Sequence, residues 1–165
     1  MPPVIRSASH EDLPAIVEIY NESGVATTAF YDVEPVTLEE RTAWFERLRN
    51  QGHPVLVLEE DGRVVGFASY GPFRDKAAYL HTVEHSVYVA EGSRSNGAGR
   101  MLLGALLDHA QGCGVHVMIG VLDADNAASR AFHKSLGFVE SAVLSEVGRK
   151  FGRWLDVVFV THHFD

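Results

Sequence analysis

The spacing of apolar residues near the start of the chain predicts a strand and then a helix. Residues 4–5 form a short apolar run that is typical of a strand. Between residues 13 and 20, apolar side chains recur at the intervals of one buried helical face, so a helix is expected from about His10. Residues 21–35 show no clear period and are expected to form a loop.

The next stretch predicts a second helix and a β-hairpin. Residues 37–40 read as a capping box, an apolar stripe follows them, and Gly52 ends the predicted helix. Two apolar runs at 55–58 and 64–68 are separated by Asp61-Gly62, a strong signal for a tight hairpin turn.

The second half of the chain alternates between strand and helix signals. The expected elements are a strand over residues 82–89, a helix through 102–107 that ends at Gly112, a strand over 115–122, a short helix over 127–136, and strands over 138–144 and 154–160. The unit at 82–122 should form a parallel crossover, whereas the preceding strands can pair through hairpins. The pattern therefore predicts one α/β domain over residues 1–165, with a mixed central sheet and helices on both faces.

Composition narrows the class of protein. The chain has 165 residues and a formal net charge of −8, and 46% of its residues are hydrophobic, so one domain with a sizeable core is expected. The negative charge disfavours a protein that binds nucleic acid or anionic membranes, because both need a basic surface. The first residues lack a signal-peptide pattern, and no apolar run approaches the roughly 20 residues that span a bilayer. We therefore expect a soluble, cytoplasmic protein with no nucleic-acid or membrane partner.

Cysteine and histidine spacing argues against a metal site. Cys113 is the only cysteine, which excludes an intramolecular disulfide and a zinc site made of cysteines, and we expect it to be buried. His81 and His85 have a spacing that would join them at one metal ion on a helix. Their neighbours favour a strand, in which four residues span roughly 13 Å. We therefore predict no metal.

A glycine-containing loop between a predicted strand and a predicted helix suits an anion. Such a turn presents free backbone N–H groups and the positive end of the helix dipole to one point. Gly97 and Gly99 would let the backbone approach a pyrophosphate closely, and Arg94 and Arg100 add positive charge. The alternative is a glycine-rich turn that only caps the helix. The loop matches neither of the standard nucleotide-binding motifs.

Two motifs in this region carry a family resemblance. The pattern Arg94-x-x-Gly97-x-Gly99 after a strand resembles the loop that binds the pyrophosphate of acetyl-CoA in the GNAT superfamily of N-acetyltransferases. The segment that begins at Asn126 and continues through His133 resembles the second cofactor-contacting helix of that superfamily and its following strand. The resemblance implies a GNAT-like α/β fold and acetyl-CoA as acetyl donor.

Further segments narrow the resemblance to the branch that acetylates phosphinothricin, methionine sulfone and methionine sulfoximine. They are residues 19–21, 34–36, 71–74, 81–89 and 150–156, so the similarity covers essentially the whole chain. Phe73 stands where a Trp is usual in this branch, and Ser95-Asn96 carries no charge where many relatives have a further basic residue. The resemblance implies a small amino acid as acceptor and a homodimer.

Two side chains are candidates for proton transfer. Acetyl transfer to an amine needs a group that takes up a proton and needs no covalent enzyme intermediate. Glu84 should lie on the opposite face of its strand from Val83, partly desolvated, which would raise its proton affinity. The alternative is an exposed strand carboxylate. His133 could deprotonate the amine or protonate the leaving thiolate, or could be a structural hydrogen-bonding residue.

The resemblance also implies binding residues. For acetyl-CoA these are Val87, Tyr88 and Val89 along the pantetheine, residues Arg94, Ser95, Asn96, Gly97, Ala98, Gly99 and Arg100 around the pyrophosphate, and then Asn126 and Ser129. For the substrate they are Tyr31, Phe73, Arg74, Lys76, Tyr79, Thr82, Glu84 and Lys150. Arg74 and Lys76 would pair with the carboxylate of an amino acid, or else belong to a solvated loop. Lys150 lies in a segment that relatives extend toward a neighbouring subunit.

The sequence therefore predicts an acetyl-CoA-dependent N-acetyltransferase that acts on the α-amino group of a small amino acid. One alternative is an acetyltransferase for polyamines or a protein N-terminus, although a polyamine pocket should present acidic residues where Arg74 and Lys76 stand. Another is a non-catalytic protein that senses acyl-CoA, which would keep the loop at 94–99 but would not need Glu84.

Overall fold

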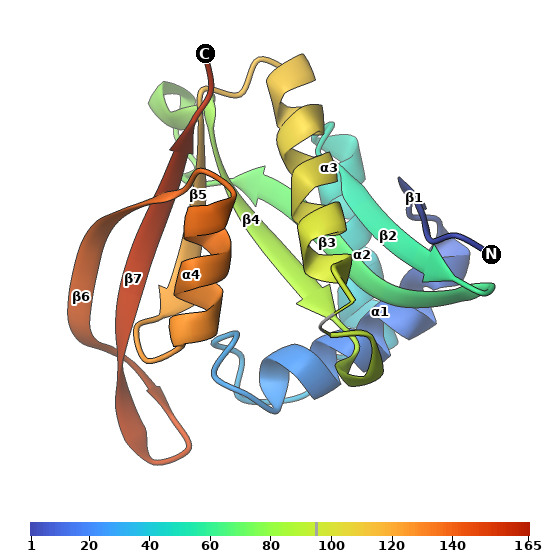
Figure 1. Ribbon diagram of the computed structural model, residues 1–165, viewed down its shortest axis with the longest axis horizontal. Coiled ribbons are helices and arrows are strands. Elements are labelled where there is room, and N and C mark those ends of the chain that lie inside the picture. The colour runs from blue at the N-terminus through green and yellow to red at the C-terminus, as the bar shows by residue number, and fades with distance from the viewer. Residues whose placement is uncertain (95) are drawn as a thin grey trace.

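A mixed seven-stranded sheet forms the centre of the computed structural model, which describes residues 1–94 and 96–165 (Figure 1). The strands lie in the order β1-β2-β3-β4-β5-β7-β6. Their bounds are β1 (Val4–Ser7), β2 (Val55–Glu60), β3 (Arg63–Pro72), β4 (Thr82–Val89), β5 (Val117–Asp123), β6 (Val139–Lys150) and β7 (Arg153–His163). In the described ranges, β4 and β5 pair in parallel and all other neighbouring strands pair antiparallel. The predicted mixed sheet and parallel crossover are confirmed.

Helices cover both faces of this sheet, as the sequence predicts. In Figure 1, α1 (Leu13–Tyr20) and α2 (Leu38–Asn50) lie behind the sheet, and α3 (Ala98–Gly112) and α4 (Ala127–Ser135) lie in front of it. Each layer encloses its own apolar core. Shorter helical turns are η1 (His10–Asp12), η2 (Asn21–Val25), η3 (Ala77–Tyr79) and η4 (Glu91–Ser93). Of the helices so described, none combines the length and the apolar character that crossing a membrane requires.

Two local sequence signals have the predicted structural result. The hydroxyl of Thr37 accepts a hydrogen bond from the amide of Glu40 at 3.1 Å, and the Glu40 carboxylate accepts one from the amide of Thr37 at 3.1 Å, so the capping box starts α2. Asp61 and Gly62 have φ values of 49° and 77° in the β2–β3 turn, the left-handed backbone that a tight hairpin needs.

Residues 21–25 differ from the sequence prediction. We expected a loop, but Asn21–Val25 continue α1 as the π-helical turn η2. The hydroxyl of Ser23 donates a hydrogen bond to the carbonyl of Val89 at 3.0 Å, and Ser23, Gly24 and Val25 are buried. Contact with β4 stabilises this turn, and a contact between distant parts of the chain leaves no period in the local sequence.

The C-terminal hairpin also extends beyond its predicted bounds. We expected strands over 138–144 and 154–160, whereas β6 and β7 reach Lys150 and His163. Because β6 is at one edge of the sheet, most of its side chains are exposed and the apolar pattern does not mark its end. Cys113, which follows α3, is exposed rather than buried as we expected.

The sheet opens between β4 and β5. The two strands pair from Thr82–Val117 to Glu84–Ile119 and then diverge, as Figure 1 shows. Over the same length β4 keeps its β3 partners up to Val89. Beyond Glu84, one edge of β4 therefore has no strand partner in the described part of the chain, and alternate residues direct backbone N–H and C=O groups to that edge.

Candidate active site

The strand β4 directs its side chains alternately to the two helical layers. Its pairing with β3 is regular from Val83 to Val89, with no bulge, so the phase of the alternation holds throughout. Ser86 and Tyr88 face the layer of α1 and α2, and Glu84 shares their face. Val83, His85 and Val87 face the layer of α3 and α4.

Glu84 has the environment that the sequence analysis predicted. Its side chain is partly buried, and burial raises the pKa of its carboxyl above the ordinary value of 4.5, while the positive charge of Arg74 opposes part of that rise. The raised pKa reports a carboxylate that binds a proton more readily than an exposed one, which a general base requires.

His133 lies on the other face of the sheet. It is buried in α4, and its ring stacks on that of His85 with centroids 5.1 Å apart and an interplanar angle of 13°. Its Nδ1 donates a hydrogen bond to the carbonyl of Ser129 at 2.8 Å, so the neutral ring carries its lone pair on Nε2, which has no hydrogen-bond partner among the described residues. Burial lowers the pKa of His133. The structure thus does not bring Glu84 and His133 together on one face.

The loop after β4 presents an open helix N-terminus. Gly97 is the N-cap residue that precedes α3, with φ of 79° and no side chain to cap the helix, so the amides of the first turn, which includes Ala98, point out of the helix. Arg94 donates from Nε to the carbonyl of Val89 at 3.3 Å, and Asn96 is exposed beside it. Ser95, which the sequence analysis assigned to this site, lies outside the described residues.

Other predicted cofactor residues connect α3 to α4. Arg100 donates from Nη2 to the hydroxyl of Ser135 at 2.7 Å. A Cβ on Gly99 would approach the ring of Phe132 to 3.4 Å, so this glycine also allows close packing of the two helices. Asn126 caps α4 by accepting a hydrogen bond from the amide of Ser129 at 3.0 Å.

The connection from β3 to β4 places several predicted substrate residues beside Glu84. Gly71 on β3 pairs with Glu84, and Phe73, Arg74 and Tyr79 follow in the connection. The guanidinium of Arg74 lies 4.7 Å from the centroid of the Phe73 ring, which contacts the Tyr79 ring edge-on at 6.0 Å. Lys76 is exposed in the same connection, and Thr82 opens β4.

Lys150, at the end of β6, contacts the segment between α1 and α2 that carries Tyr31. The Nζ of Lys150 donates to the carbonyls of Phe30 at 2.9 Å and Gly24 at 3.3 Å. Lys150 is therefore buried within its own chain, where it holds this segment. The hydroxyl of Tyr31 is buried without a hydrogen-bond partner among the described residues, and burial raises its pKa to about 12.

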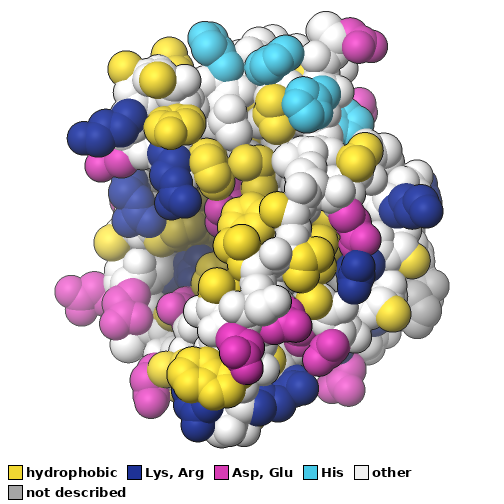
Figure 2. Space-filling model, turned by 90° about the vertical axis from the view of Figure 1, so that its left-hand side faces the viewer, with side chains coloured by type: hydrophobic (Ala, Val, Ile, Leu, Met, Phe, Trp, Pro, Cys, Tyr) yellow, Lys and Arg dark blue, Asp and Glu magenta, His cyan; other side chains and the backbone are white. Residues whose placement is uncertain are grey.

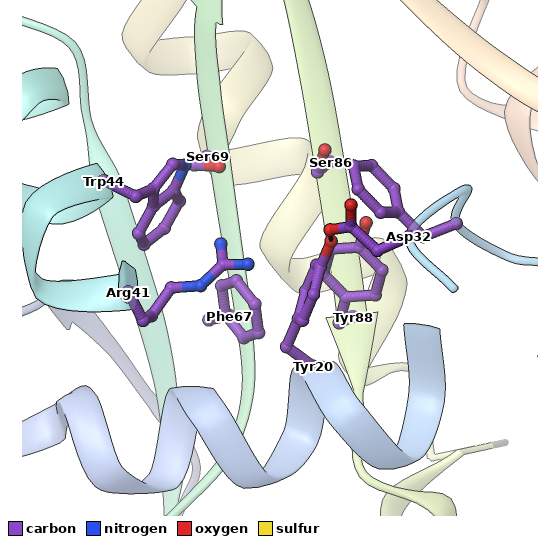
Figure 3. A pocket seen from close by; sticks show the side chains of 9 residues that line it. Tyr20, Asp32, Arg41, Trp44, Phe67, Ser69, Ser86 and Tyr88 are labelled. Atoms are coloured by element: carbon purple, nitrogen blue, oxygen red, sulfur yellow. Dashed lines mark hydrogen bonds between the residues drawn. The ribbon is translucent and has the colours of Figure 1, made fainter. Parts of the chain in front are cut away.

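The sequence analysis missed a pocket on the Glu84 face of the sheet. This pocket has a volume of about 190 Å³ and lies between the α1–α2 layer and strands β3 and β4 (Figure 3). Aromatic rings form its walls, and Arg41, Asp32, Ser69 and Ser86 contribute polar groups. Arg41 precedes Trp44, Phe45 and Leu48 at helical intervals, so an arginine on the apolar stripe of α2 was the available signal.

No group of three or more His, Cys, Asp or Glu side chains in residues 1–94 and 96–165 is arranged to hold a metal ion.

Comparison with known proteins identifies the family. The profile of the acetyltransferase (GNAT) family matches residues 13–138. The chain belongs to the GNAT acetyltransferase family. This acetyltransferase is 47% identical over 161 residues to the L-amino acid N-acyltransferase of Escherichia coli K12, with 98% of this chain and 94% of the relative covered.

A second relative and a solved structure place the acetyltransferase in the predicted branch. It is 45% identical over 162 residues to the L-methionine sulfoximine/L-methionine sulfone acetyltransferase of Pseudomonas aeruginosa, with 98% of this chain and 94% of the relative covered. A phosphinothricin acetyltransferase from Sinorhizobium meliloti, solved in complex with acetyl-CoA, superposes with a TM-score of 0.95 at 33% identity, over 99% of this chain and 89% of that one. The predicted family, fold and enzyme class are confirmed.

Proposed function

We propose that this acetyltransferase transfers the acetyl group of acetyl-CoA to the α-amino group of a small amino acid of the methionine sulfone, methionine sulfoximine or phosphinothricin type. The observation that carries the proposal is the partly buried Glu84 beside the open edge of β4, with Arg74 close enough to affect its pKa. A base with a cation nearby suits an acceptor that carries both an amine and a carboxylate. The names of the relatives support the same class of acceptor.

The open edge and the open helix N-terminus fit acetyl-CoA. Backbone groups on the edge of β4 that β5 leaves open beyond Glu84 can hydrogen-bond the amides of a pantetheine arm, and the uncapped amides of α3 can bind its phosphates. The other contacts that we propose with acetyl-CoA are made by residues that the sequence predicts for it. The residues are Val87, Tyr88 and Val89 for the arm, Arg94, Asn96, Gly97, Ala98, Gly99 and Arg100 for the pyrophosphate, and Asn126 and Ser129 beyond them.

The residues of the chain then have separate tasks in the reaction. Acetyl-CoA supplies an activated acetyl group, which the amine attacks directly. The bond between the acetyl carbon and sulfur then breaks, and CoA leaves as a thiol that takes up the second proton lost by the nitrogen. Glu84 takes a proton from the substrate ammonium, directly or through one water, and so frees the nitrogen lone pair. Backbone N–H groups on the open edge of β4 stabilise the negative charge that develops on the carbonyl oxygen. His133 has a lone pair on Nε2 but lies on the opposite face, so we assign it the smaller share of proton transfer.

The substrate contacts are proposed from the connection between β3 and β4. Arg74 and Lys76 pair with the α-carboxylate, and Phe73, Tyr79 and Thr82 surround them. Tyr31 closes the site from the segment between α1 and α2. Because both hydrogen bonds of Lys150 go to carbonyls of that segment, we assign Lys150 to holding Tyr31 in place.

A substrate panel tests the proposal. Thiol release from acetyl-CoA would be measured with L-methionine sulfone, L-methionine sulfoximine, L-phosphinothricin, the decarboxylated analogue of methionine sulfone, spermidine and a short peptide. We expect turnover with the three amino acids and little with the rest, because the other amines lack a free carboxylate on the carbon that bears the reacting amine, where Arg74 would bind it. Preferred turnover of spermidine or the peptide would contradict the proposal. Binding of acetyl-CoA without turnover of any amine would favour the non-catalytic sensor.

We also propose a homodimer that works in the cytoplasm. Apolar side chains gather on the face of the molecule that carries β6 and β7 (Figure 2). The exposed apolar residues of this hairpin include Val143, Val147, Phe151 and Trp154. An exposed apolar surface of this kind is typical of an interface. Light scattering during size-exclusion chromatography should give twice the chain mass of 18.1 kDa, and Trp154→Glu should give a monomer. A wild-type monomer at micromolar concentration would contradict this part of the proposal.

A further inference from the structure

The pocket on the Glu84 face of the sheet contains a buried cation that has no role in the reaction proposed above. Arg41 extends from α2 into this pocket and is only 7% exposed. Its guanidinium lies over two rings, 3.9 Å from the centroid of Tyr20 and 4.5 Å from that of Trp44. Figure 3 shows its nitrogen atoms pointing into the space between Ser69 and Ser86.

The protein leaves part of this guanidinium unsatisfied. The Nε of Arg41 is buried and has no hydrogen-bond partner among the described residues. Burial lowers the pKa of Arg41, although Tyr20 and the charge of Asp32 oppose part of that change. Asp32 lines the same pocket, but its carboxylate accepts a hydrogen bond from the hydroxyl of Tyr20. Burying a guanidinium without a carboxylate partner is costly, and an acceptor group supplied by a ligand would offset that cost.

The remaining polar groups of the pocket can donate hydrogen bonds to the same point. Ser69 and Ser86 face each other across β3 and β4, and their hydroxyls line the pocket together with Arg41. Tyr20, Trp44 and Phe67 supply apolar walls. A group with several acceptor oxygens on a short apolar stem matches this arrangement. The volume of about 190 Å³ is below the roughly 300–1,000 Å³ of pockets for drug-sized ligands, and so suits one side chain rather than a whole substrate.

The pocket also lies at a useful distance from the proposed base. The Ser69–Ser86 pair is two residues along the strands from the Gly71–Glu84 pair, on the same face. Two residues correspond to about 7 Å along a strand. A short linear amino acid could therefore place its amine near Glu84 and the end of its side chain near Arg41.

We propose that this pocket receives the oxygen-bearing end of the substrate side chain, and that Arg41 selects amino acids whose side chains end in sulfone, sulfoximine or phosphinate oxygens. The inference rests on the proposed function and adds the residue that distinguishes these acceptors from unoxidised amino acids of similar shape. Arg41 then complements Arg74, because one cation binds the side chain and the other binds the carboxylate.

A competition experiment isolates this role. L-Methionine sulfone and L-methionine differ in the two oxygens that Arg41 would bind, and the ratio of their acetylated products in one mixture gives the ratio of their kcat/KM values. The wild type should favour the sulfone. Arg41→Met should lower that ratio about 10- to 100-fold, the range expected for loss of a hydrogen bond to a charged donor. Arg41→Lys, which keeps the charge but not the planar fork, should give an intermediate ratio.

Arg49→Met is the matched control. Arg49 lies on the same helix with its guanidinium 5.6 Å from the Phe45 ring, but it is exposed and does not line this pocket. The ratio of kcat/KM for L-methionine sulfone to kcat/KM for L-methionine should be the same in Arg49→Met as in the wild type. If Arg41→Met does not fold, Ser69→Ala and Ser86→Ala test the same pocket and should lower the ratio by a smaller factor.

The outcomes separate this inference from the proposed function. If the wild type acetylates these amino acids but Arg41→Met lowers both rates equally, Arg41 holds the carboxylate or the fold, and the selectivity proposal is wrong. An unchanged ratio at an unchanged rate also overturns it. If the wild type acetylates no amino acid at all, the proposed function fails first and this inference falls with it.

Discussion

Neighbouring residues of β4 point into two very different environments. On the face of α1 and α2, Glu84 is partly buried beside a pocket that contains a buried cation and two serine hydroxyls. On the face of α3 and α4, His85 is buried with neither ring nitrogen hydrogen-bonded to a described residue, and it stacks on His133. Both faces contain titratable groups in unusual surroundings.

The difference lies in what each face leaves accessible. The Glu84 face combines a base, donors and open volume, which together can bind a substrate. The His85 face is filled with protein, since a Cβ added to Gly120 would lie 2.8 Å from Nε2 of His85. A perturbed pKa alone therefore does not identify the reactive site. The reactive site is identified by open volume and hydrogen-bond donors beside the titratable group.

The largest expected effect separates the two proton-transfer candidates. Glu84→Gln should lower kcat by about 100-fold or more, as expected for loss of a general base, while His133→Gln should lower it less than tenfold. Acetyl-CoA affinity should stay near the wild-type value in Glu84→Gln. Because burial raises the pKa of Glu84, the folded protein disfavours its charged form, and the neutral amide should not lower the melting temperature at pH 7. A greater loss of kcat in His133→Gln would reverse our assignment.

A smaller effect tests how tightly the His85 face is filled. Gly120→Ala should destabilise the protein by about 1–3 kcal/mol, because the new methyl group would approach His85 to 2.8 Å and Val160 to 2.9 Å. Gly104→Ala is the matched control, since nothing lies within 4 Å of a Cβ at this position in α3, and it should stabilise the helix by about 0.5–1 kcal/mol. Urea unfolding measures both. Equal stability of Gly120→Ala and the wild type would show that the side chains around Gly120 can move to make room for a methyl group, and would contradict a tightly filled face.

The smallest effect is a pH dependence of stability. Burial lowers the pKa of His85 to about 3 in the folded protein, whereas an unfolded histidine titrates near 6.5. Between these values the unfolded chain binds a proton that the folded chain does not, so stability falls as the pH falls below about 6.5. Over the first pH unit below 6.5, His85→Leu should lose about 1 kcal/mol less stability than the wild type. The exposed His81→Leu should behave as the wild type, and an equal pH slope in His85→Leu would contradict a buried neutral His85.

Local signals in the sequence were sufficient for much of the fold. The capping box at Thr37 and the left-handed turn at Asp61 depend on residues close together in the chain, and both are present as predicted. The alternation of β4 also predicted that Glu84 and Val83 would lie on opposite faces.

Other features depend on contacts that the sequence pattern does not encode. The turn η2 depends on the hydrogen bond from Ser23 to Val89, which are distant in the chain. The His85–His133 stack joins β4 to α4. Arg41 was visible as a charged residue on an apolar stripe, but the pocket that it enters exists only once α2 packs against β3 and β4.

A crystal structure with CoA and L-methionine sulfone would test the central claim most directly. Our account predicts that the substrate amine lies on the α1–α2 face, within about 2.6–3.2 Å of the Glu84 carboxylate or joined to it by one water, with the sulfone oxygens near Arg41. An amine on the opposite face, next to Nε2 of His133, would contradict the account.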